Sequence, residues 1–510
     1  MEKLAFIDLG SNSVRFVVIS IRSNGSHTLE FQQKEAVRLG EGLNENSRLS
    51  EEAMNRAVSR LKTYAHMADV MGVDHTIAVA TAAVRNAANG QEFVDRVLKE
   101  TGIAIRIISG KEEAYLGYLG VINTIALKDF ILFDLGGASV EISLVRNRQQ
   151  VQSVSVPIGA VTLTEKFQLQ NQPDPSIVEE AISFVKQQLS SLDWLVNSQL
   201  PIVGIGGTVR TLAKINQRSS NYMLAKLHNY DLPLDRLQEI FHVLSTKTCT
   251  DRKKISGLAS ERSDIIVAGS IVVKTLTELV NTPRLTVGGC GLREGLFYDY
   301  YGKYYQNNNP ILPDILQHST LNFLRHLGYD DVSHPQYVMQ MALKLYDGLQ
   351  PLMGAKNSRL RIMLKTAALL HDVGKTINYY NHARHSAFMI AGAPLYGLSQ
   401  TEHLITSFIA GYHHGISSKI FRAYRYSGLI APQDWEWIRK LGIILHLAET
   451  IDTTYEQIVT SADFSFAENV SILILTTKEN SDHSAAEAEM QKIQKQFKKE
   501  FGSSLIVIWK

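Results

Sequence analysis

The chain has 510 residues, of which 45% are hydrophobic and 20% charged, with a formal net charge of +2. A chain of this length is too long to fold around a single hydrophobic core, so we expect roughly three or four domains. The balanced charge argues against a nucleic-acid binder, and no apolar run approaches the roughly 18 residues of a membrane helix. Only Cys249 and Cys290 are present, and no signal peptide precedes the first strand, so we expect a cytoplasmic protein.

Residues 1–122 are predicted to form the first α/β half. Residues 6–21 give two strands around a tight turn, and residues 51–71 have helical spacing with Ser50 as the N-cap. Further short apolar strands are expected at 76–80 and 103–108.

Residues 123–306 repeat this plan. Two strands surround a turn after Asp134, helices follow, and apolar strands are expected at 201–205 and 285–289. Strands that alternate with helices in this way predict two α/β halves.

The same Gly/Ser turn ends the first strand of each half. It follows Asp8 in one copy and Asp134 in the other, and such turns present backbone N–H groups to a phosphate. A structural turn would explain any single copy, but the repetition predicts two halves that face each other across a phosphate site. The expected phosphate-binding residues are Gly10, Ser11, Asn12, Ser13, Gly136, Gly137, Ala138, Ser139, Gly206, Gly207 and Thr208, with Gly288 and Gly289 as a fourth loop.

Carboxylates lie close to these loops in sequence. Glu112 and Glu113 begin a predicted helix, where the helix dipole alone would favour them, and one of them could instead position and deprotonate water. A hairpin would bring Glu141 back beside Asp134, where the two could share Mg²⁺, although Glu141 could also be a solvated strand residue. Arg85 follows a buried strand and could clamp a phosphate.

Together these segments resemble the exopolyphosphatase / guanosine pentaphosphate phosphohydrolase (Ppx/GppA) family. The resemblance is carried, in order, by Asp8–Ser13, Ser109–Ala114, Asp134–Glu141, Gly206–Arg210 and Gly291–Gly295. It implies duplicated ribonuclease-H-like halves of the actin/Hsp70/sugar-kinase superfamily and a homodimer. It also implies that Glu113 is the base for the attacking water, that Asp134 and Glu141 hold Mg²⁺, and that Arg85 binds phosphate. Ala138 replaces a glycine that is usual in the family, which is tolerated if its φ is negative.

Residues 311–462 follow a linker at 307–310 and are predicted to be helical, and the resemblance extends into them as an HD-like domain. His371 and Asp372 are adjacent and could chelate a second divalent metal together with His334 and Asp452, or they could be a structural hydrogen-bonded pair. Further imidazoles come from His382, His385, His413 and His414.

This helical region could be a second phosphohydrolase acting on nucleotides, or a scaffold that extends a polyphosphate channel and supports dimerisation. The residues that could line such a channel are Arg422, Arg425, Arg439 and Lys440, each of which could equally lie on a solvated helix face. Residues 463–510 are predicted to form a small β-α-β unit, with strands at 470–477 and 505–509 around a helix at 485–501.

The sequence therefore predicts an Mg²⁺-dependent exopolyphosphatase. Activated water in the cleft between the halves would remove orthophosphate from the ends of inorganic polyphosphate. Two alternatives stay open: hydrolysis of guanosine pentaphosphate to the tetraphosphate at the same site, and a non-catalytic sensor of polyphosphate or an alarmone.

Overall fold

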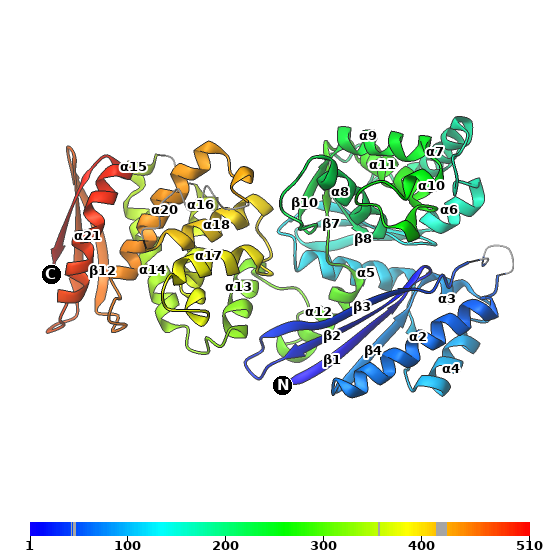
Figure 1. Ribbon diagram of the computed structural model, residues 1–510, viewed down its shortest axis with the longest axis horizontal. Helices are drawn as coiled ribbons and strands as arrows, with labels where there is room; N and C mark the ends of the chain where they lie inside the picture. Colours follow the sequence, from blue (N-terminus) through cyan, green and yellow to red (C-terminus); the bar gives the residue numbers. More distant parts are fainter. Residues whose placement is uncertain (42, 44–46, 355–356, 415–425) are drawn as a thin grey trace. The chain divides into compact units, whose positions relative to one another are not determined.

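The computed structural model describes residues 1–41, 43, 47–354, 357–414 and 426–510. The chain divides into two compact units, Met1–Ile315 and Leu316–Lys510 (Figure 1). Each unit is described by itself below. Among the described residues, no helix is both long enough and apolar enough to cross a membrane.

The first half of the unit Met1–Ile315 is built on a five-stranded sheet with the order β3-β2-β1-β4-β5. Central strand β1 pairs antiparallel with β2 and parallel with β4. Its strands are β1 (Glu2–Leu9), β2 (Ser13–Ile21), β3 (His27–Ala36), β4 (His75–Ala80) and β5 (Ile105–Ile107), and its helices are α2 (Glu51–Val70), α3 (Ala82–Asn86), α4 (Gly90–Thr101) and α5 (Gly110–Ile122). The predicted cap of α2 is confirmed, because Ser50 accepts a hydrogen bond from the N–H of Ala53.

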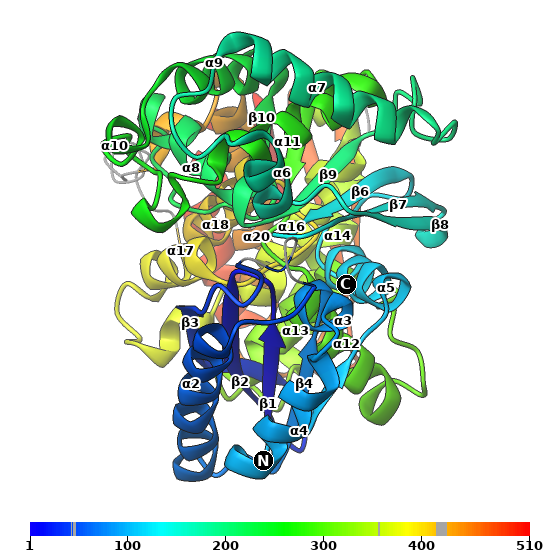
Figure 2. The same ribbon diagram turned by 90° about the vertical axis from the view of Figure 1, so that its right-hand side faces the viewer.

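The second half repeats the topology with a six-stranded sheet of order β10-β11-β9-β6-β7-β8. Strand β6 takes the place of β1, since it pairs antiparallel with β7 and parallel with β9. The strands are β6 (Phe130–Leu135), β7 (Val140–Arg146), β8 (Gln149–Val156), β9 (Ile202–Gly206), β10 (Tyr230–Pro233) and β11 (Arg284–Val287). The two α/β halves predicted from the repeated pattern are therefore present (Figure 2).

Helices of the second half surround this sheet and also reach the first half. They are α6 (Ala160–Phe167), α7 (Pro175–Ser190), α8 (Gly207–Ser219), α9 (Leu234–Thr246), α10 (Cys249–Arg252), the 3-10 turn η1 (Ser260–Arg262), α11 (Ile266–Val280) and α12 (Leu292–Tyr305). Helix α12 packs on α5, and its Phe297 ring meets Phe6 of β1 edge-on at 6.3 Å. A Cβ on Gly295 would lie only 1.9 Å from the carbonyl oxygen of Leu116, so glycine is what allows α12 and α5 to approach this closely.

The unit Leu316–Lys510 is mostly helical. Its helices are α13 (Ile315–His326), α14 (Ser333–Gly348), α15 (Gln350–Met353), α16 (Ser358–Leu370), α17 (His382–Gly392), α18 (Gln400–Tyr412), α20 (Pro432–Thr450) and α21 (Ser484–Phe501), with 3-10 turns η2 (Val373–Thr376) and η3 (Ser427–Leu429). Apolar faces of α14, α16, α18 and α20 form one continuous core. Helix α16 ends at Leu370, so His371 and Asp372 leave the helix and begin a turn.

A three-stranded sheet with the order β12-β13-β14 follows these helices. Strands β13 (Val470–Thr477) and β14 (Ser504–Trp509), with helix α21 between them, confirm the predicted β-α-β unit. Strand β12 (Val459–Ala467) was not predicted and pairs antiparallel with β13. Its apolar residues are interrupted by Ser and Asp, which weakens the strand signal.

Candidate active site

Both predicted phosphate loops line one cleft in the unit Met1–Ile315. The turns are alike, because the N–H of Gly10 donates to the carbonyl of Ser13 (3.1 Å) and the N–H of Gly136 to that of Ser139 (3.0 Å). The loops approach each other closely, since a Cβ on Gly137 would lie 3.1 Å from the Cβ of Ser11. All eight residues predicted in these loops line the cleft: Gly10, Ser11, Asn12, Ser13, Gly136, Gly137, Ala138 and Ser139.

Backbone conformation decides which loop positions require glycine. Ala138 is not among the described residues with a positive φ, so its methyl group is accommodated. Gly206 has a φ of +104°, and a Cβ there would lie 2.5 Å from the carbonyl oxygen of Leu135. Gly206 and Gly207 line the cleft at the N-terminus of α8, where free N–H groups favour an anion. Thr208 is fully buried behind them and is not a lining residue among those described.

The prediction that Gly288 and Gly289 form a fourth phosphate-binding loop is wrong. The N–H of Gly288 donates to the carbonyl of Gly204 (2.8 Å), and that of Gly289 donates to Nδ1 of His228 (3.1 Å). Because both N–H groups are already bonded, they have no donor to offer a phosphate. The following residues, Cys290–Glu294, line the cleft instead.

Three carboxylates converge on the floor of the cleft. Asp134 on β6 lies directly opposite Glu141 on β7, as the hairpin spacing predicted. Glu141 is buried, and its Oε1 accepts hydrogen bonds from Ser139 (2.6 Å) and Ser155 (2.7 Å). Burial and the charge of Glu141 raise the pKa of Asp134 to about 7. The set therefore carries more buried negative charge than its surroundings neutralise.

The two adjacent glutamates at the start of α5 differ in position. Glu113 lines the cleft, and burial followed by the charge of Glu141 raises its pKa well above the usual value, against the opposing effect of Arg85. Glu112 is more exposed and pairs with Arg106. The sequence alone leaves open whether Glu112 or Glu113 acts on water, and the structure places only Glu113 in the lining of the cleft.

The side chain of Arg85 contacts the carboxylate of Glu113. Its Nη1 donates to Oε2 of Glu113 (3.0 Å) and to the carbonyl of Ile108 (2.8 Å). Arg85 is not among the described residues that line the cleft. Phosphate binding by Arg85 stays a prediction, whereas its contact with Glu113 is a feature of the structure.

Cations also line this cleft, and the cationic wall that they form continues into a neighbouring cavity of about 420 Å³. Arg15, Arg210, Arg262 and Arg293 line both spaces, and the neighbouring cavity adds Lys34 and Lys214. Burial, then the charges of Arg15 and Arg293, lower the pKa of Arg210 to about 10. This cationic wall therefore favours an anion.

Sequence reasoning did not assign a role to any of these cations. Arg210 and Arg293 belong to the quoted glycine-containing segments, so their motifs were a usable signal. Arg15 on β2 and Arg262 in η1 had no comparable signal, because they reach the cleft only through the fold.

The donor set of the cleft fits Mg²⁺. Asp134, Glu141 and Glu113 offer hard carboxylate oxygens, which Mg²⁺ prefers, and burial raises the pKa of each of them, so a cation would stabilise their charged forms. A cation on this floor and a phosphate against the arginine wall would compensate both charge clusters at once. The arrangement is suited to phosphoryl-transfer chemistry.

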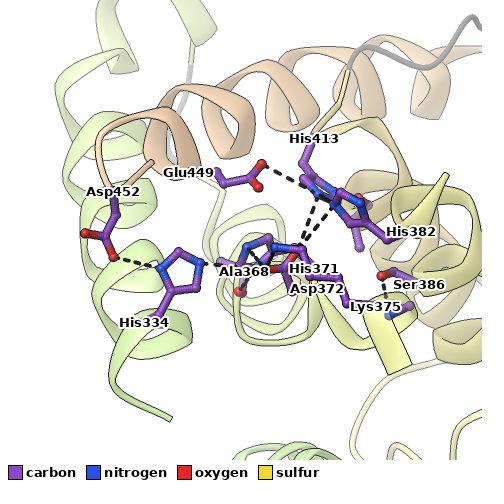
Figure 3. Close-up of polar contacts among 12 residues, drawn as sticks. His334, Ala368, His371, Asp372, Lys375, His382, Ser386, His413, Glu449 and Asp452 are labelled. Atoms are coloured by element: carbon purple, nitrogen blue, oxygen red, sulfur yellow. Dashed lines mark hydrogen bonds and ion pairs between the residues drawn. The ribbon is translucent and has the colours of Figure 1, made fainter. Parts of the chain in front are cut away.

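The predicted metal ligands of the other unit also lie together (Figure 3). Nε2 of His371 is 3.6 Å and Nε2 of His334 is 3.8 Å from Oδ2 of Asp372. Asp452 lies one layer further out, because its Oδ2 is 2.7 Å from Nδ1 of His334 and its Oδ1 accepts from the N–H of Gln457 (2.8 Å). Three of the four predicted residues therefore face one point, while Asp452 supports His334.

The two described residues that were predicted to line a polyphosphate channel, Arg439 and Lys440, are each paired with a glutamate instead. Nε of Arg439 donates to Glu500 (2.8 Å), and Nζ of Lys440 donates to Glu436 (2.7 Å) on the same helix. Both pairs are of the kind found on ordinary helix surfaces. Arg422 and Arg425 lie outside the described residues.

Comparison with known proteins yields two family matches. Residues 17–304 match the Ppx/GppA phosphatase family, and residues 317–494 match domain III of Ppx/GppA phosphatases. The HD-like character of the helical region stays a prediction, because the second match describes a domain of this same family.

Relatives and solved structures agree with these matches. A protein named guanosine-5'-triphosphate,3'-diphosphate pyrophosphatase from Vibrio vulnificus is 29% identical over 429 residues, which cover 81% of each chain. A solved exopolyphosphatase from Cytophaga hutchinsonii is 28% identical with a TM-score of 0.56, over 59% of this chain and 98% of that one. The Aquifex aeolicus family member gives 29% identity and a TM-score of 0.52, over 60% and 99%. The predicted actin-like α/β fold is confirmed.

Proposed function

We propose that this chain, which belongs to the Ppx/GppA phosphatase family, hydrolyses the terminal phosphoanhydride bond of inorganic polyphosphate in the cleft of the unit Met1–Ile315. The observation that carries the proposal is the pairing of buried carboxylates with a wall of arginines in one cavity. A polyphosphate end that brings Mg²⁺ with it would satisfy both sides, because each charge cluster then meets its opposite.

Glu113 takes the role of general base. The oxygen of a water molecule bonds to the terminal phosphorus, the bridging P–O bond breaks, and the water proton passes to Glu113. Arg85 holds the Glu113 carboxylate in place and opposes the rise in its pKa. Asp134 and Glu141 would hold Mg²⁺, which supplies neutralising charge when bound, and the N–H groups of the two loops bind the phosphoryl oxygens.

The lining of the cationic cavity favours a polyphosphate chain over a nucleotide. It combines Arg15, Lys34, Arg210, Lys214, Arg262 and Arg293 and has no aromatic side chain among the described lining residues. A run of cations suits successive phosphates, whereas a guanine base gains most from an aromatic surface.

Guanosine pentaphosphate is the second candidate substrate. The names of the relatives from Vibrio vulnificus and Aeromonas salmonicida, the latter 30% identical over 406 residues, favour it. It would occupy the same cleft with its phosphates, so the two candidates differ only in the far end of the ligand.

The test is orthophosphate release with Mg²⁺ from long-chain polyphosphate and, separately, from guanosine pentaphosphate. We expect a higher kcat/KM for polyphosphate, and a loss of roughly 10²–10⁴-fold in kcat in Glu113→Gln for either substrate. Glu112→Gln is the matched control, because Glu112 has the same side chain as Glu113 but is not among the described residues that line the cleft, and the variant should retain activity within about twofold.

Three results would change the assignment. A higher kcat/KM for guanosine pentaphosphate would select the second candidate. Undiminished turnover in Glu113→Gln would remove the proposed base. Binding of polyphosphate without any phosphate release by the wild type would favour the non-catalytic sensor.

A further inference from the structure

Two packed helices join the halves of the unit Met1–Ile315. Helix α5 of the first half lies against α12 of the second, with glycines where the two backbones meet. A Cβ on Gly120 would lie 2.2 Å from the carbonyl oxygen of Gly291, and a Cβ on Gly295 would lie 1.9 Å from that of Leu116. Backbones this close leave little room for sliding, so these helices fix the halves to each other where they cross.

An ion pair joins the two halves away from these helices. Nη2 of Arg38, in the segment after β3 of the first half, lies 3.6 Å from Oδ2 of Asp264. Asp264 lies between η1 and α11 of the second half. The two side chains are partly exposed, at 45% for Arg38 and 32% for Asp264, so the pair lies at the surface of the unit.

The backbone around Arg38 is hydrogen-bonded to the first phosphate loop. The N–H groups of Val37 (3.1 Å) and Arg38 (3.0 Å) both donate to the carbonyl of Asn12. The N–H of Gly40 donates to the carbonyl of Ser11 (2.8 Å). Because Ser11 and Asn12 both line the cleft, a displacement of Arg38 would be transmitted to the lining.

Arg38 itself has an uncommon backbone conformation. Its φ is +47°, in the left-handed region that residues other than glycine rarely adopt. The residues on either side, Val37 and Leu39, are buried in the core of the first half and hold the segment in place. Such a conformation persists only where the surrounding structure requires it, and it is frequent at functional positions.

Asp264 belongs to a segment that carries part of the cationic wall. It follows Arg262 by two residues, and Arg262 lines both the cleft and the neighbouring cationic cavity. Oδ1 of Asp264 accepts a hydrogen bond from the N–H of Ile265 (3.0 Å), whereas Oδ2 faces Arg38. The ion pair therefore connects a phosphate loop of one half with an arginine-bearing segment of the other.

The space around the ion pair is continuous with the cleft in its lining. Arg38 and Asp264 both border a cavity of about 200 Å³, which shares Ser11, Asn12 and Ile265 with the cleft. The pair thus spans the two halves directly beside the loop that is expected to bind phosphate.

We propose that Arg38 and Asp264 are positioning residues whose ion pair holds the two halves closed around the substrate. The attraction between them keeps the loop at Ser11 and Asn12 close to Arg262, so that both can bind one polyanion. Without either charge, the halves separate more readily and the substrate dissociates more easily. This role rests on the function proposed for the cleft, and it affects KM more than the bond-breaking step.

Asp264→Asn is the decisive variant. If the Asp264 carboxylate acted directly on a polyanionic substrate, its removal would relieve repulsion and lower the KM. If it acts through Arg38, the KM should instead rise about threefold, the size expected for a partly exposed ion pair, with kcat within about twofold. The assay uses whichever of polyphosphate and guanosine pentaphosphate the wild type hydrolyses.

A double-mutant cycle shows whether the two residues act together. Arg38→Gln should also raise the KM about threefold, and Arg38→Gln/Asp264→Asn should be no worse than either single variant. Arg48→Gln is the control, because Arg48 makes a similar ion pair with Glu92 (3.5 Å) within the first half, and its KM should not change. A lower or unchanged KM in Asp264→Asn, or effects that multiply in the double variant, would overturn the proposal.

Hydrogen–deuterium exchange tests the ion pair without any substrate. The amides of residues 37–40 should exchange about threefold faster in Asp264→Asn than in the wild type, because Asp264 reaches this segment through the Arg38 side chain. Arg48→Gln should leave their exchange unchanged. Equal exchange in the wild type and Asp264→Asn would overturn the proposal. A wild type that hydrolyses neither substrate would contradict the proposed function instead, and the exchange measurement would still decide whether the ion pair holds the halves together.

Discussion

The cleft of the unit Met1–Ile315 and the imidazole cluster of the unit Leu316–Lys510 use opposite chemistry to gather charge. The cleft sets carboxylate oxygens against arginines, so its two walls need a hard cation and a polyanion together. The cluster gathers neutral imidazoles around Asp372, and burial lowers the pKa of His371 to about 4. Donor type therefore separates the two regions before any substrate is considered.

The local backbone explains why the two regions differ. Loops at the ends of β1 and β6 present N–H groups to the cleft, and strand pairing sets Asp134 opposite Glu141. In the cluster, Nδ1 of His371 and Nδ1 of His382 each lie at hydrogen-bonding distance from a nearby backbone carbonyl, which turns Nε2 inward. Strand ends thus offer donors to an anion, while the histidine turns offer lone pairs to a cation.

Arg210→Met should give the largest effect among changes that test this comparison. The variant removes a buried cation from the cleft that the carboxylates also line, and we expect kcat/KM for polyphosphate to fall about 10²–10³-fold. Arg218→Met, an exposed position on the same helix, is the control. Equal kcat/KM values in Arg210→Met and Arg218→Met would contradict a role for Arg210 in binding the polyphosphate.

Gly206→Ala compares backbone strain in the two units. At Gly206 a side chain meets both a positive φ and the carbonyl of Leu135, so we expect about 2–3 kcal/mol of destabilisation. Gly502 has a φ of +70° with nothing within 4 Å, so Gly502→Ala should lose only about 1 kcal/mol. Denaturant unfolding measures both, and equal losses would show that crowding at Gly206 is relieved by movement.

The sequence predicted the repeated turns and the Asp134–Glu141 hairpin because both depend on residues close in the chain. It predicted wrongly where hydrogen bonds come from distant segments, as for Gly289, whose N–H meets His228. Arg15 and Arg262 escaped notice for the same reason. In the cluster, the motif around His371 was visible, but the place of Asp452 behind His334 depends on packing between α14 and α20.

Ser155→Ala tests the support behind a cleft carboxylate. The variant removes one of two hydroxyl groups that hold Oε1 of Glu141, and we expect the apparent affinity for Mg²⁺ to fall about tenfold. Ser153→Ala is the control, because Ser153 pairs with Ser143 in the sheet and not with Glu141. Activity is titrated against Mg²⁺, and an unchanged midpoint in Ser155→Ala would argue against Glu141 as a ligand.

The smallest expected effect is a pH dependence of KM that arises from Lys34. Its surroundings differ from those of Lys375 in the other unit. Burial, then Arg262 and Arg15, lower the pKa of Lys34 to about 8. Burial also disfavours the charge of Lys375, but Asp372 and the hydroxyl of Tyr455 raise its pKa above the usual value. Of these two lysines, only Lys34 should therefore lose its charge as the pH rises through about 8.

Lys34 is protonated below about pH 8 and neutral above it, so its attraction for a polyphosphate chain should weaken as the pH rises. We expect the KM for polyphosphate to increase about threefold between pH 7 and 9.5, with a smaller change in kcat. Lys34→Arg keeps its charge over this range and should give a flatter KM, while sharing every effect that arises from titration of the substrate. If KM changed with pH in the same way in the wild type and in Lys34→Arg, the distal phosphates of the substrate would not bind in the cavity that Lys34 lines.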